Sequence, residues 1–526
     1  MVLLTKALTA AASAILLALT SAAEARTYFV SPGGNDSNSG TSTSAPWRSI
    51  AKVNSKTFQA GDSILFQGGH TFDGAIFLTP ATVLGTSSTP TTIASYGHGR
   101  ATLRSADDAV TIGNLGNIAI KNLRLSARDA GVLAYNDTAS TRFRSIHLTN
   151  LDILSPYVGI YITAWGPNQA MGFSDVAIRD VNVKAPAGSG IYIAGNNSKP
   201  FSHRNVVIDG VHIWRHGGDG IGVIGIERLV IQNALIHDGG GQWNGAIELN
   251  YVNNGLVQYN EAYNQVVTPG GVDGGGIDLD ESVTNTIVQF NYVHDNAGPG
   301  FSAFQGTGIP WADNVFRYNI SQNNGRGPTN VPSEMVIGAY GQNGITGLQV
   351  YGNTFYTSVG SANVNSVVRF EAANSAGIIA NNIFYVEGAN PRLIDTQSFR
   401  PTNMLFRGNT YYTTHPGKII WSSVLYSSLS TWQGATGQEK IGSTNVARTE
   451  NPRLVDPGGG GILGGYYPEK LAAYKLRAGS PAIDAGLDIR TLFGIDYGRK
   501  DFYGVTIPRN ATKLNIGASE DDTRAQ

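Results

Sequence analysis

Acidic residues crowd into one short stretch of the chain, GGGIDLDESVTN. If Ile277 and Leu279 point into a core, as alternate residues of a strand do, then Asp278 and Asp280 share the opposite face and a glutamate follows directly. Carboxyl groups held this close repel one another. Either one keeps its proton, a cation binds between them, or a basic side chain inserts. The first outcome supplies the protonated and ionised pair of a glycosidase, whereas a bound cation would serve a metal-assisted lyase.

The rest of the chain is sparing with charge. Lys plus Arg number 37 and Asp plus Glu 38, together 14% of 526 residues, so the net charge is −1. This balance predicts neither nucleic acid nor a membrane surface as a partner. The chain has no cysteine, which excludes disulfides, thiolate metal sites and a cysteine nucleophile. Any charge-based function must therefore be local.

The N-terminus has the pattern of an export signal. Lys6 supplies the positive start, residues 7–19 form a mostly apolar run too short to span a bilayer, and Ala23-Glu24-Ala25 matches a small-x-small cleavage site. We therefore predict that residues 1–25 are a signal peptide and that the mature protein is secreted or periplasmic. No later stretch approaches about 18 uninterrupted apolar residues, so no membrane span is predicted.

A short phrase recurs along the chain, each time as a β-type segment interrupted by a turn residue, as in HLTNLDI and VYGNTFY. Successive copies are 23 to 34 residues apart, and this period without helical spacing is typical of a β-solenoid. Asn suits the turn because it tolerates the left-handed conformation and can bond to the Asn one coil above. The recurring turn residues are Asn122, Asn150, Asp180, Gly210, Asn233, Asn260, Asn291, Asn319, Asn353, Asn382 and Asn409.

This pattern resembles the right-handed parallel β-helix of the pectate-lyase-like superfamily. The opening TYFVSPGGNDSNSGTSTSAPWRSI with AGDSILFQGG, and the final LRAGSPAIDAG and NIGASE, resemble the first and last coils of such proteins. We therefore expect an all-β right-handed parallel β-helix of about 11 to 13 coils. The resemblance implies an exported bacterial protein that cleaves acidic or neutral polysaccharides, but the fold alone does not determine the reaction. The expected parts are an N-terminal cap with the first coils (26–105), a central helix with the groove (106–415) and a closing segment (416–526).

A second strand precedes each recurring phrase, and its buried aliphatic residues set the register. The outward residues then stack in columns, with about 4.8 Å between adjacent coils. This places Glu248 beside Asp278, with Asp280 on the same strand, as a cluster of three carboxylates. The first outward column reads Tyr161, Tyr192, Gly222, Glu248, Asp278, Ser302 and Arg369.

Three functions fit this cluster. The first is a glycoside hydrolase acting on a polysaccharide or oligosaccharide, with Asp278 and Glu248 as acid and nucleophile or base, Asp280 tuning the pair, and no cofactor. The second is a lyase working by β-elimination on a uronic-acid glycan, in which the same three residues bind Ca²⁺. No Lys falls in the outward columns to act as its base, although Arg and His residues are available. The third is a carbohydrate-binding or adhesin-like solenoid without chemistry. The predicted substrate-binding residues are Tyr161, Tyr192, Trp243, Trp311, Arg317 and Arg369.

Two further acids have a structural interpretation. Asp219 and Asp273 lie just before their strands in HGGDGIG and GGVDGGG, and we expect them to be turn residues rather than acids or ligands. A solenoid with capped ends can be monomeric, and we expect a monomer.

Overall fold

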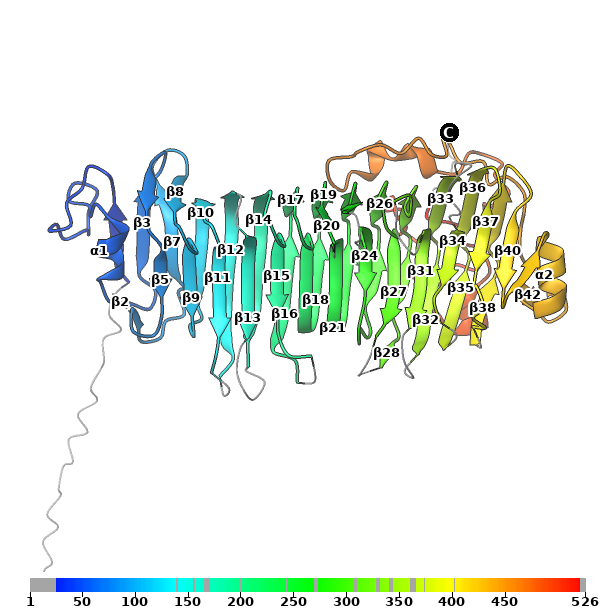
Figure 1. Ribbon diagram of the computed structural model, residues 1–526, viewed down its shortest axis with the longest axis horizontal. Coiled ribbons are helices and arrows are strands. Elements are labelled where there is room, and N and C mark those ends of the chain that lie inside the picture. The colour runs from blue at the N-terminus through cyan, green and yellow to red at the C-terminus, as the bar shows by residue number, and fades with distance from the viewer. Residues whose placement is uncertain are drawn as a thin grey trace, which may run out of the picture.

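The computed structural model is a parallel β-solenoid of about 11 turns, as the repeat predicted. Its strands stack side by side along the long axis of the molecule (Figure 1). The structure describes residues 25–138, 141–154, 157–164, 171–197, 200–242, 244–268, 273–306, 310–327, 332–339, 344–359, 366–372, 374–401 and 403–520. The predicted signal peptide lies almost wholly outside these residues.

Each coil contributes strands to three faces, which we call A, B and C. Face A consists of β5 (Ile76–Leu78), β9 (Val110–Gly113), β11 (Ala130–Asn136), β13 (Val158–Ala164), β15 (Ile191–Ala194), the first parts of β18 (Ile221–Gln232) and β21 (Gly245–Gln258), β24 (Gly275–Leu279), β27 (Phe301–Gln305), β31 (Ser333–Ala339), β34 (Ser366–Phe370), β37 (Arg392–Asp395) and β40 (Lys418–Trp421).

Face B follows face A in each coil. It consists of β1 (Thr27–Val30), β3 (Ser63–Gln67), β7 (Thr91–Tyr96), the first parts of β10 (Ile118–Ser126), β12 (Phe143–Leu154) and β14 (Phe173–Lys184), β16 (His203–Asp209), the second parts of β18 and β21, β25 (Ile287–Gln289), β28 (Trp311–Ala312), β29 (Val315–Arg317), β32 (Ile345–Tyr351), β35 (Ser375–Ala380) and β38 (Asn403–Arg407).

Face C completes the coil. It consists of β4 (Thr71–Asp73), β8 (Ala101–Arg104), the second parts of β10, β12 and β14, β17 (His212–Trp214), β19 (Leu235–His237), β22 (Glu261–Tyr263), β26 (Tyr292–His294), β30 (Ile320–Gln322), β33 (Thr354–Val359), β36 (Ile383–Gly388) and β39 (Thr410–Thr413).

The interior is a continuous column of aliphatic and aromatic side chains. Ile160, Ile191, Ile221 and Ile247 succeed one another on adjacent strands of face A, and all four are fully buried. Because each inward residue rests on its counterpart one coil away, a slip of one residue would turn a whole set of aliphatic side chains outward. The core therefore fixes which residues of each strand face solvent.

Buried asparagines support the C-terminal half of the solenoid. Asn319 Nδ2 donates to Asn353 Oδ1 at 3.0 Å, and the same bond joins successive members from Asn260 to Asn409. Asn409 Nδ2 ends the ladder by donating to Glu439 Oε1 at 2.7 Å. The predicted amide ladder is therefore confirmed in these coils.

The C-terminal segment returns along the outside of the solenoid. It includes η1 (Pro468–Lys470), η2 (Ala472–Tyr474) and α3 (Ile489–Phe493), and in Figure 1 its orange part lies over the top of the molecule. Leu471, Tyr474 and Phe502 pack on outward residues of face C, while Ile489 and Tyr497 pack on face B. Faces B and C are thus covered over their C-terminal coils.

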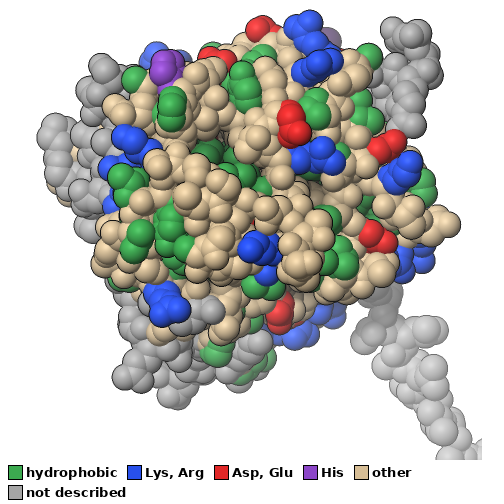
Figure 2. Space-filling model, turned by 90° about the vertical axis from the view of Figure 1, so that its right-hand side faces the viewer, with side chains coloured by type: hydrophobic (Ala, Val, Ile, Leu, Met, Phe, Trp, Pro, Cys, Tyr) green, Lys and Arg blue, Asp and Glu red, His purple; other side chains and the backbone are tan. Residues whose placement is uncertain are grey.

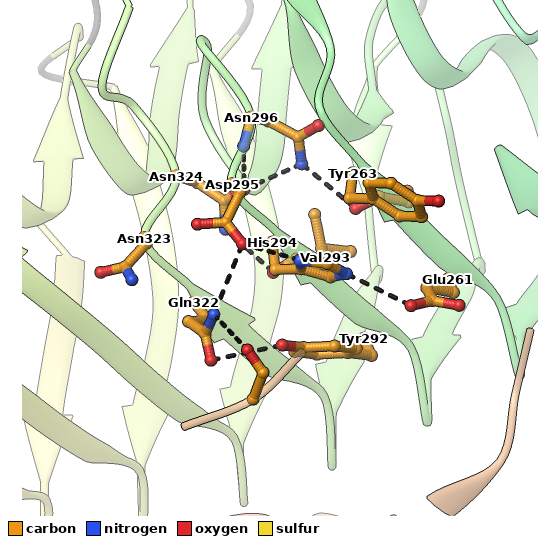
Figure 3. Close-up of polar contacts among 12 residues, drawn as sticks. Glu261, Tyr263, Tyr292, Val293, His294, Asp295, Asn296, Gln322, Asn323 and Asn324 are labelled. Atoms are coloured by element: carbon orange, nitrogen blue, oxygen red, sulfur yellow. Dashed lines mark hydrogen bonds and ion pairs between the residues drawn. The ribbon is translucent and has the colours of Figure 1, made fainter. Parts of the chain in front are cut away.

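A buried carboxylate anchors this segment near the middle of the molecule. Glu261 Oε1 and Oε2 accept hydrogen bonds from the backbone N–H groups of Leu463 and Gly465, both at 2.6 Å. His294 lies between Glu261, at 3.3 Å, and Asp295, at 2.9 Å (Figure 3). Burial lowers the pKa of His294, but its bonds to the two carboxylates outweigh this effect and the pKa is raised. When His294 is protonated, its charge offsets that of the buried Glu261.

Short elements close the two ends of the solenoid. Near the N-terminus, α1 (Ile50–Asn54) adjoins the small pair β2 (Phe58–Gln59) and β6 (Val83–Leu84). The other end carries β41 (Val424–Tyr426), α2 (Leu429–Thr436) and the pair β42 (Lys440–Ile441) and β43 (Thr444–Asn445). Figure 2 faces this end, where exposed hydrophobic side chains alternate with polar surface and scattered charges. Capping of this kind keeps the last strands from pairing with another molecule.

One further strand pair, β20 (Gly240–Gly241) and β23 (Val266–Val267), lies in the turns between faces C and A. Among the described residues, no helix has both the length and the apolar character needed to cross a bilayer.

Candidate active site

The outward residues of face A stack in the register that the sequence predicted. Tyr192 pairs with Gly222, Gly222 with Glu248, and Glu248 with Asp278 on β24. Asp278 pairs in turn with Ser302. Adjacent coils are about 4.8 Å apart, so the carboxyl groups of Glu248 and Asp278 are immediate neighbours.

Asp280 directly follows β24, and its carboxyl group lies close enough to that of Asp278 for the two to repel. The two buried residues that flank Asp278, Ile277 and Leu279, are at most 1% exposed and hold the strand to the core. Asp280 N donates to the Leu249 carbonyl at 2.9 Å, so its backbone is fixed against the preceding coil. The predicted trio of carboxylates is therefore assembled on face A.

Two acids that we expected to be turn residues also reach this cluster. Asp219 accepts a hydrogen bond from Gly245 N at 3.0 Å, as a turn residue can, but its carboxyl group also lies close enough to Glu248 for that acid to help raise the pKa of Asp219. Asp273 precedes β24 and lies close enough to Glu248 for the two carboxylates to repel. The turn interpretation was therefore incomplete, because both side chains belong to a cluster of five acids.

The environment of the cluster keeps protons on it at neutral pH. Burial raises the pKa of Asp278 well above its usual range, and the charges of Asp280 and Glu248 add to the effect. Burial and then Glu248 raise the pKa of Asp280 to about 8 and that of Asp273 to about 6. Burial and Glu248 likewise raise the pKa of Asp219.

The described residues supply little to offset this repulsion. None of the five acids forms an ion pair with a described Lys, Arg or His. Glu248 Oε1 accepts a hydrogen bond from Asn250 Nδ2 at 2.7 Å. Asp278 Oδ1 is fully buried and has no hydrogen-bond partner within the described part of the chain. Neighbouring carboxyl groups can then share protons, which gives the mixture of protonated and ionised acids needed for acid–base chemistry.

Aromatic side chains adjoin the acids on one side. The rings of Tyr161 and Tyr192 are 5.8 Å apart at an angle of 30°. A Cβ atom on Gly222 would lie 2.8 Å from Asp219 Oδ2 and 2.9 Å from the Tyr192 ring. Glycine at this position therefore lets the aromatic ring and the acid approach each other, next to Glu248.

Two predicted sugar contacts are held by other parts of the protein. Trp311 is fully buried and its indole N–H donates to the Leu279 carbonyl at 3.0 Å, so it supports the strand of Asp278 from inside. Arg317, on face B, donates to Gln289 Oε1 at 2.8 Å and to the Asp496 carbonyl of the C-terminal segment at 3.1 Å. Neither position fits the predicted role, because the core holds Trp311 and the C-terminal segment holds Arg317.

The other two predicted contacts have different outcomes. Arg369 lies in the same outward column as Asp278, three coils further along, where it forms an ion pair with Glu371. It could contact only a ligand that extends roughly 14 Å from Asp278 along face A. Trp243 lies outside the described residues.

The same cluster was predicted to bind Ca²⁺ under the lyase alternative. Among the described residues, no group of three or more His, Asp or Glu side chains has a geometry suited to a metal ion. The arrangement of Glu248, Asp278 and Asp280 thus does not fit a three-carboxylate Ca²⁺ site.

Comparisons with known proteins agree with this architecture. The family described as right handed beta helix region matches residues 168–355. A lacto-N-biosidase of Bifidobacterium longum subsp. longum is 25% identical over 632 aligned residues, which cover 96% of this chain and 37% of that protein. The chain thus spans little more than a third of the length of this curated relative.

Solved structures show the same fold. Crystal structures of a GH136 lacto-N-biosidase from Eubacterium ramulus, as native protein and as selenomethionine derivative, each match with a TM-score of 0.50 and 19% identity. Each match covers 64% of this chain and 64% of that one. The predicted right-handed parallel β-helix fold is confirmed.

Proposed function

We propose that this protein is a carbohydrate-active enzyme, and specifically a glycoside hydrolase that cleaves an oligosaccharide or polysaccharide bound across face A. The observation that carries the proposal is a cluster of five carboxyl groups on face A, without a described cationic partner, in which burial and neighbouring charges raise the pKa of Asp219, Asp273, Asp278 and Asp280. Its similarity to a lacto-N-biosidase supports the same reaction class.

Glycoside hydrolysis needs one carboxylic acid to protonate the leaving oxygen and one carboxylate to attack the sugar or activate water. Asp280 suits the first role because its pKa of about 8 keeps it protonated at neutral pH. Asp273, with a pKa of about 6, is mostly ionised there and suits the second role, for which Glu248 is the neighbouring alternative. Asp278, with one oxygen fully buried, lies beside Glu248 in the same column and is a neighbour of the reacting pair rather than a member of it.

The aromatic pair Tyr161 and Tyr192 offers a place for sugar rings to stack beside the acids. Tyrosine combines an apolar ring face with a hydroxyl group, which suits an amphipathic sugar. We further propose that residues 1–25 direct the protein out of the cytoplasm, where it would meet such glycans. N-terminal sequencing of the protein recovered outside the cytoplasm, beginning near Arg26, would test the export step.

The reaction class can be tested with a panel of glycans that includes a chromogenic lacto-N-bioside, the glycoside named by the similar enzyme. Reducing ends and the absorbance of unsaturated uronate are followed with and without a chelator. A hydrolase produces reducing ends without unsaturated product, whether or not the chelator is present. An unsaturated product would show that the proposed reaction class is wrong.

Single substitutions test the residues. Asp280→Asn and Asp273→Asn should each lower kcat by about 10²- to 10⁴-fold, the usual contribution of a general acid or base. Asp313→Asn, a change at an exposed aspartate between β28 and β29, is the matched control and should leave turnover unchanged. Full activity of both cluster variants would remove the site assignment.

A further inference from the structure

Face C carries an open groove at a distance from the carboxyl cluster. The groove has a volume of about 480 Å³ and is formed by strands β10, β12, β14 and β17. It contains an aromatic ring, cationic side chains and hydrogen-bonding groups, and none of these takes part in the proposed hydrolysis. Its lining side chains are Arg124, Asp152, Leu154, Asn182, Lys184 and Trp214.

The groove is open because the C-terminal segment does not extend this far. That segment is anchored on Glu261 of β22, and its apolar side chains pack on face C from β26 onwards. Upstream of β22 the outward residues of face C remain accessible, and Leu154 is 36% exposed. The same face is thus protein-covered in its C-terminal half and open in its N-terminal half.

The coil register places the groove residues in two neighbouring columns. Leu154, Lys184 and Trp214 succeed one another on adjacent strands, and Asp152 and Asn182 lie beside them in the second column. Arg124 precedes Asp152 in that column, so Arg124 and Trp214 are separated by three coils, or roughly 14 Å.

The aromatic platform is held in place. The Trp214 ring stacks on His212 with centroids 4.2 Å apart and planes at 25°, and His212 Nε2 is 2.9 Å from His237 Nε2. Burial, and secondarily His237, lower the pKa of His212 to about 4, so this imidazole is neutral at pH 7. The positive charge of the groove therefore comes from its Lys and Arg side chains.

These side chains leave the groove with excess positive charge. Asp152 forms an ion pair with Arg100 and lies 3.9 Å from Arg124. Lys184 is exposed and has no ion-pair partner among the described residues. One carboxylate therefore faces three cations, and the site complements a ligand with negative charge.

We propose that this groove binds an acidic saccharide chain, with a sugar ring on Trp214 and carboxylate or sulfate groups beside Lys184 and Arg124. An indole offers a flat apolar surface, the cations pair with charged substituents, and Asn182 and Asp152 can bond to hydroxyl groups. The choice of a saccharide among anionic ligands rests on the proposed function. The groove would hold a polymer on face C independently of cleavage on face A.

Retention of the full-length mature protein in affinity gels tests the proposal, with polygalacturonate as the acidic probe and galactan as the neutral one. The parent protein carries Asp280→Asn so that neither polymer is consumed. Trp214→Ala should weaken retention by polygalacturonate about tenfold or more, as loss of a central aromatic contact does. Lys184→Gln should weaken it to a smaller extent, and the remaining binding should depend less on salt.

Matched controls separate the groove from the rest of the surface. Tyr467→Ala removes another exposed aromatic ring, one that carries Lys470 4.0 Å above it, and Lys121→Gln removes an exposed cation on the face B part of β10. Neither control should change retention. The Lys184→Gln variant also serves as a check on folding. Because Lys184 is exposed, this substitution removes no core contact, and weaker retention of the variant reports on the groove itself.

The possible outcomes decide the proposal. The proposal is overturned if polygalacturonate does not retain the parent protein, or if it retains the Trp214→Ala variant equally well. It is also overturned if galactan retains the parent as strongly as polygalacturonate does and Lys184→Gln has no effect. Retention that depends on both side chains supports it. Since binding is measured without turnover, retention without glycan cleavage in the panel would reject only the proposed hydrolase, and cleavage without retention would reject only the groove.

Discussion

The carboxyl cluster should make the stability of the fold fall as pH rises, and Asp280→Asn should remove part of this fall. Burial and the neighbouring charges raise the pKa of Asp280 from 3.8 to about 8. Between these values the folded protein binds more protons than the unfolded chain, so each rise in pH favours unfolding. The stabilisation of the folded state by the protonated acid is complete below about pH 4 and is lost as pH rises through 8.

The size of the effect follows from the shift in pKa. For a single acid with these two pKa values, the linkage relation limits the loss in free energy of unfolding between pH 5 and pH 8 to about 4 kcal/mol. Asp280 is only partly buried, and solvent screening reduces the contribution to roughly 2 kcal/mol. For a chain of this length we expect Tm to change by about 1–2 °C per kcal/mol. The Tm of Asp280→Asn should therefore rise relative to that of the wild type by about 2–4 °C between pH 5 and pH 8.

Thermal unfolding of wild-type protein and Asp280→Asn at pH 5, 6.5 and 8 measures this difference. The variant should gain on the wild type at each step upward in pH, while the control Asp313→Asn follows the wild type throughout. A Tm difference that stays constant or narrows with rising pH would show that Asp280 is not held in a carboxyl cluster. The same substitution should lower kcat by about 10²- to 10⁴-fold, so a more stable but far less active protein is the expected combination.

Three other substitutions test the supports of the site. Asn319→Ala breaks the buried amide ladder and leaves its neighbours unpaired, so it should destabilise the fold by about 1–3 kcal/mol in thermal or denaturant unfolding. Glu261→Gln removes the charged acceptor of the C-terminal segment and should speed amide hydrogen exchange in that segment about tenfold; unchanged exchange would mean that the anchor is not needed. Gly222→Ala should raise KM and lower kcat in steady-state assays, because the new methyl group would meet both the Tyr192 ring and the Asp219 carboxyl group; an unchanged KM would remove Tyr192 from the substrate site.

The register of face A could be predicted because the core is strictly periodic. Alternating aliphatic residues mark the inward side of each strand, and every coil repeats the pattern, so Glu248 and Asp278 had to be neighbours. The sequence alone does not set the register of the coil that contains β31 (Ser333–Ala339), so the predicted column passes from Ser302 to Arg369 without it. There Val336 occupies the column between Ser302 and Arg369.

Asp219 and Asp273 escaped this reasoning because both precede their strands. If the alternation of each strand is extended back to these residues, Asp219 falls on the inward side with Ile221, and Asp273 falls on the inward side with Ile277. Backbone turns interrupt that count, since Gly274 has a φ of +75°. A sequence signal did exist, because each acid is followed by glycine and then by the strand that borders the cluster.

The recurring turn residue also proved to be of two kinds. In the first coils Asn122 and Asn150 themselves have left-handed backbone, with φ of 56° each, as predicted for the turn. From Asn260 onwards the left-handed residue comes one position earlier, as at Tyr259, and the Asn side chain turns into the core. The sequence aligns these residues in one column because both turns favour Asn, for different physical reasons.

This change of turn coincides with the region that must carry the acids. Asn260 and Asn291 lie in the coils of Glu248 and Asp278, and their side chains bond to each other across the coils at 2.9 Å. Removing all the charge from the cluster would stabilise the fold, yet carboxyl groups that repel one another are held there at neutral pH. A structure can retain such a site only if the surrounding coils oppose the repulsion. The continuous ladder of buried amides, the Trp311 indole bonded behind β24 and the C-terminal segment anchored on Glu261 are all placed to do this.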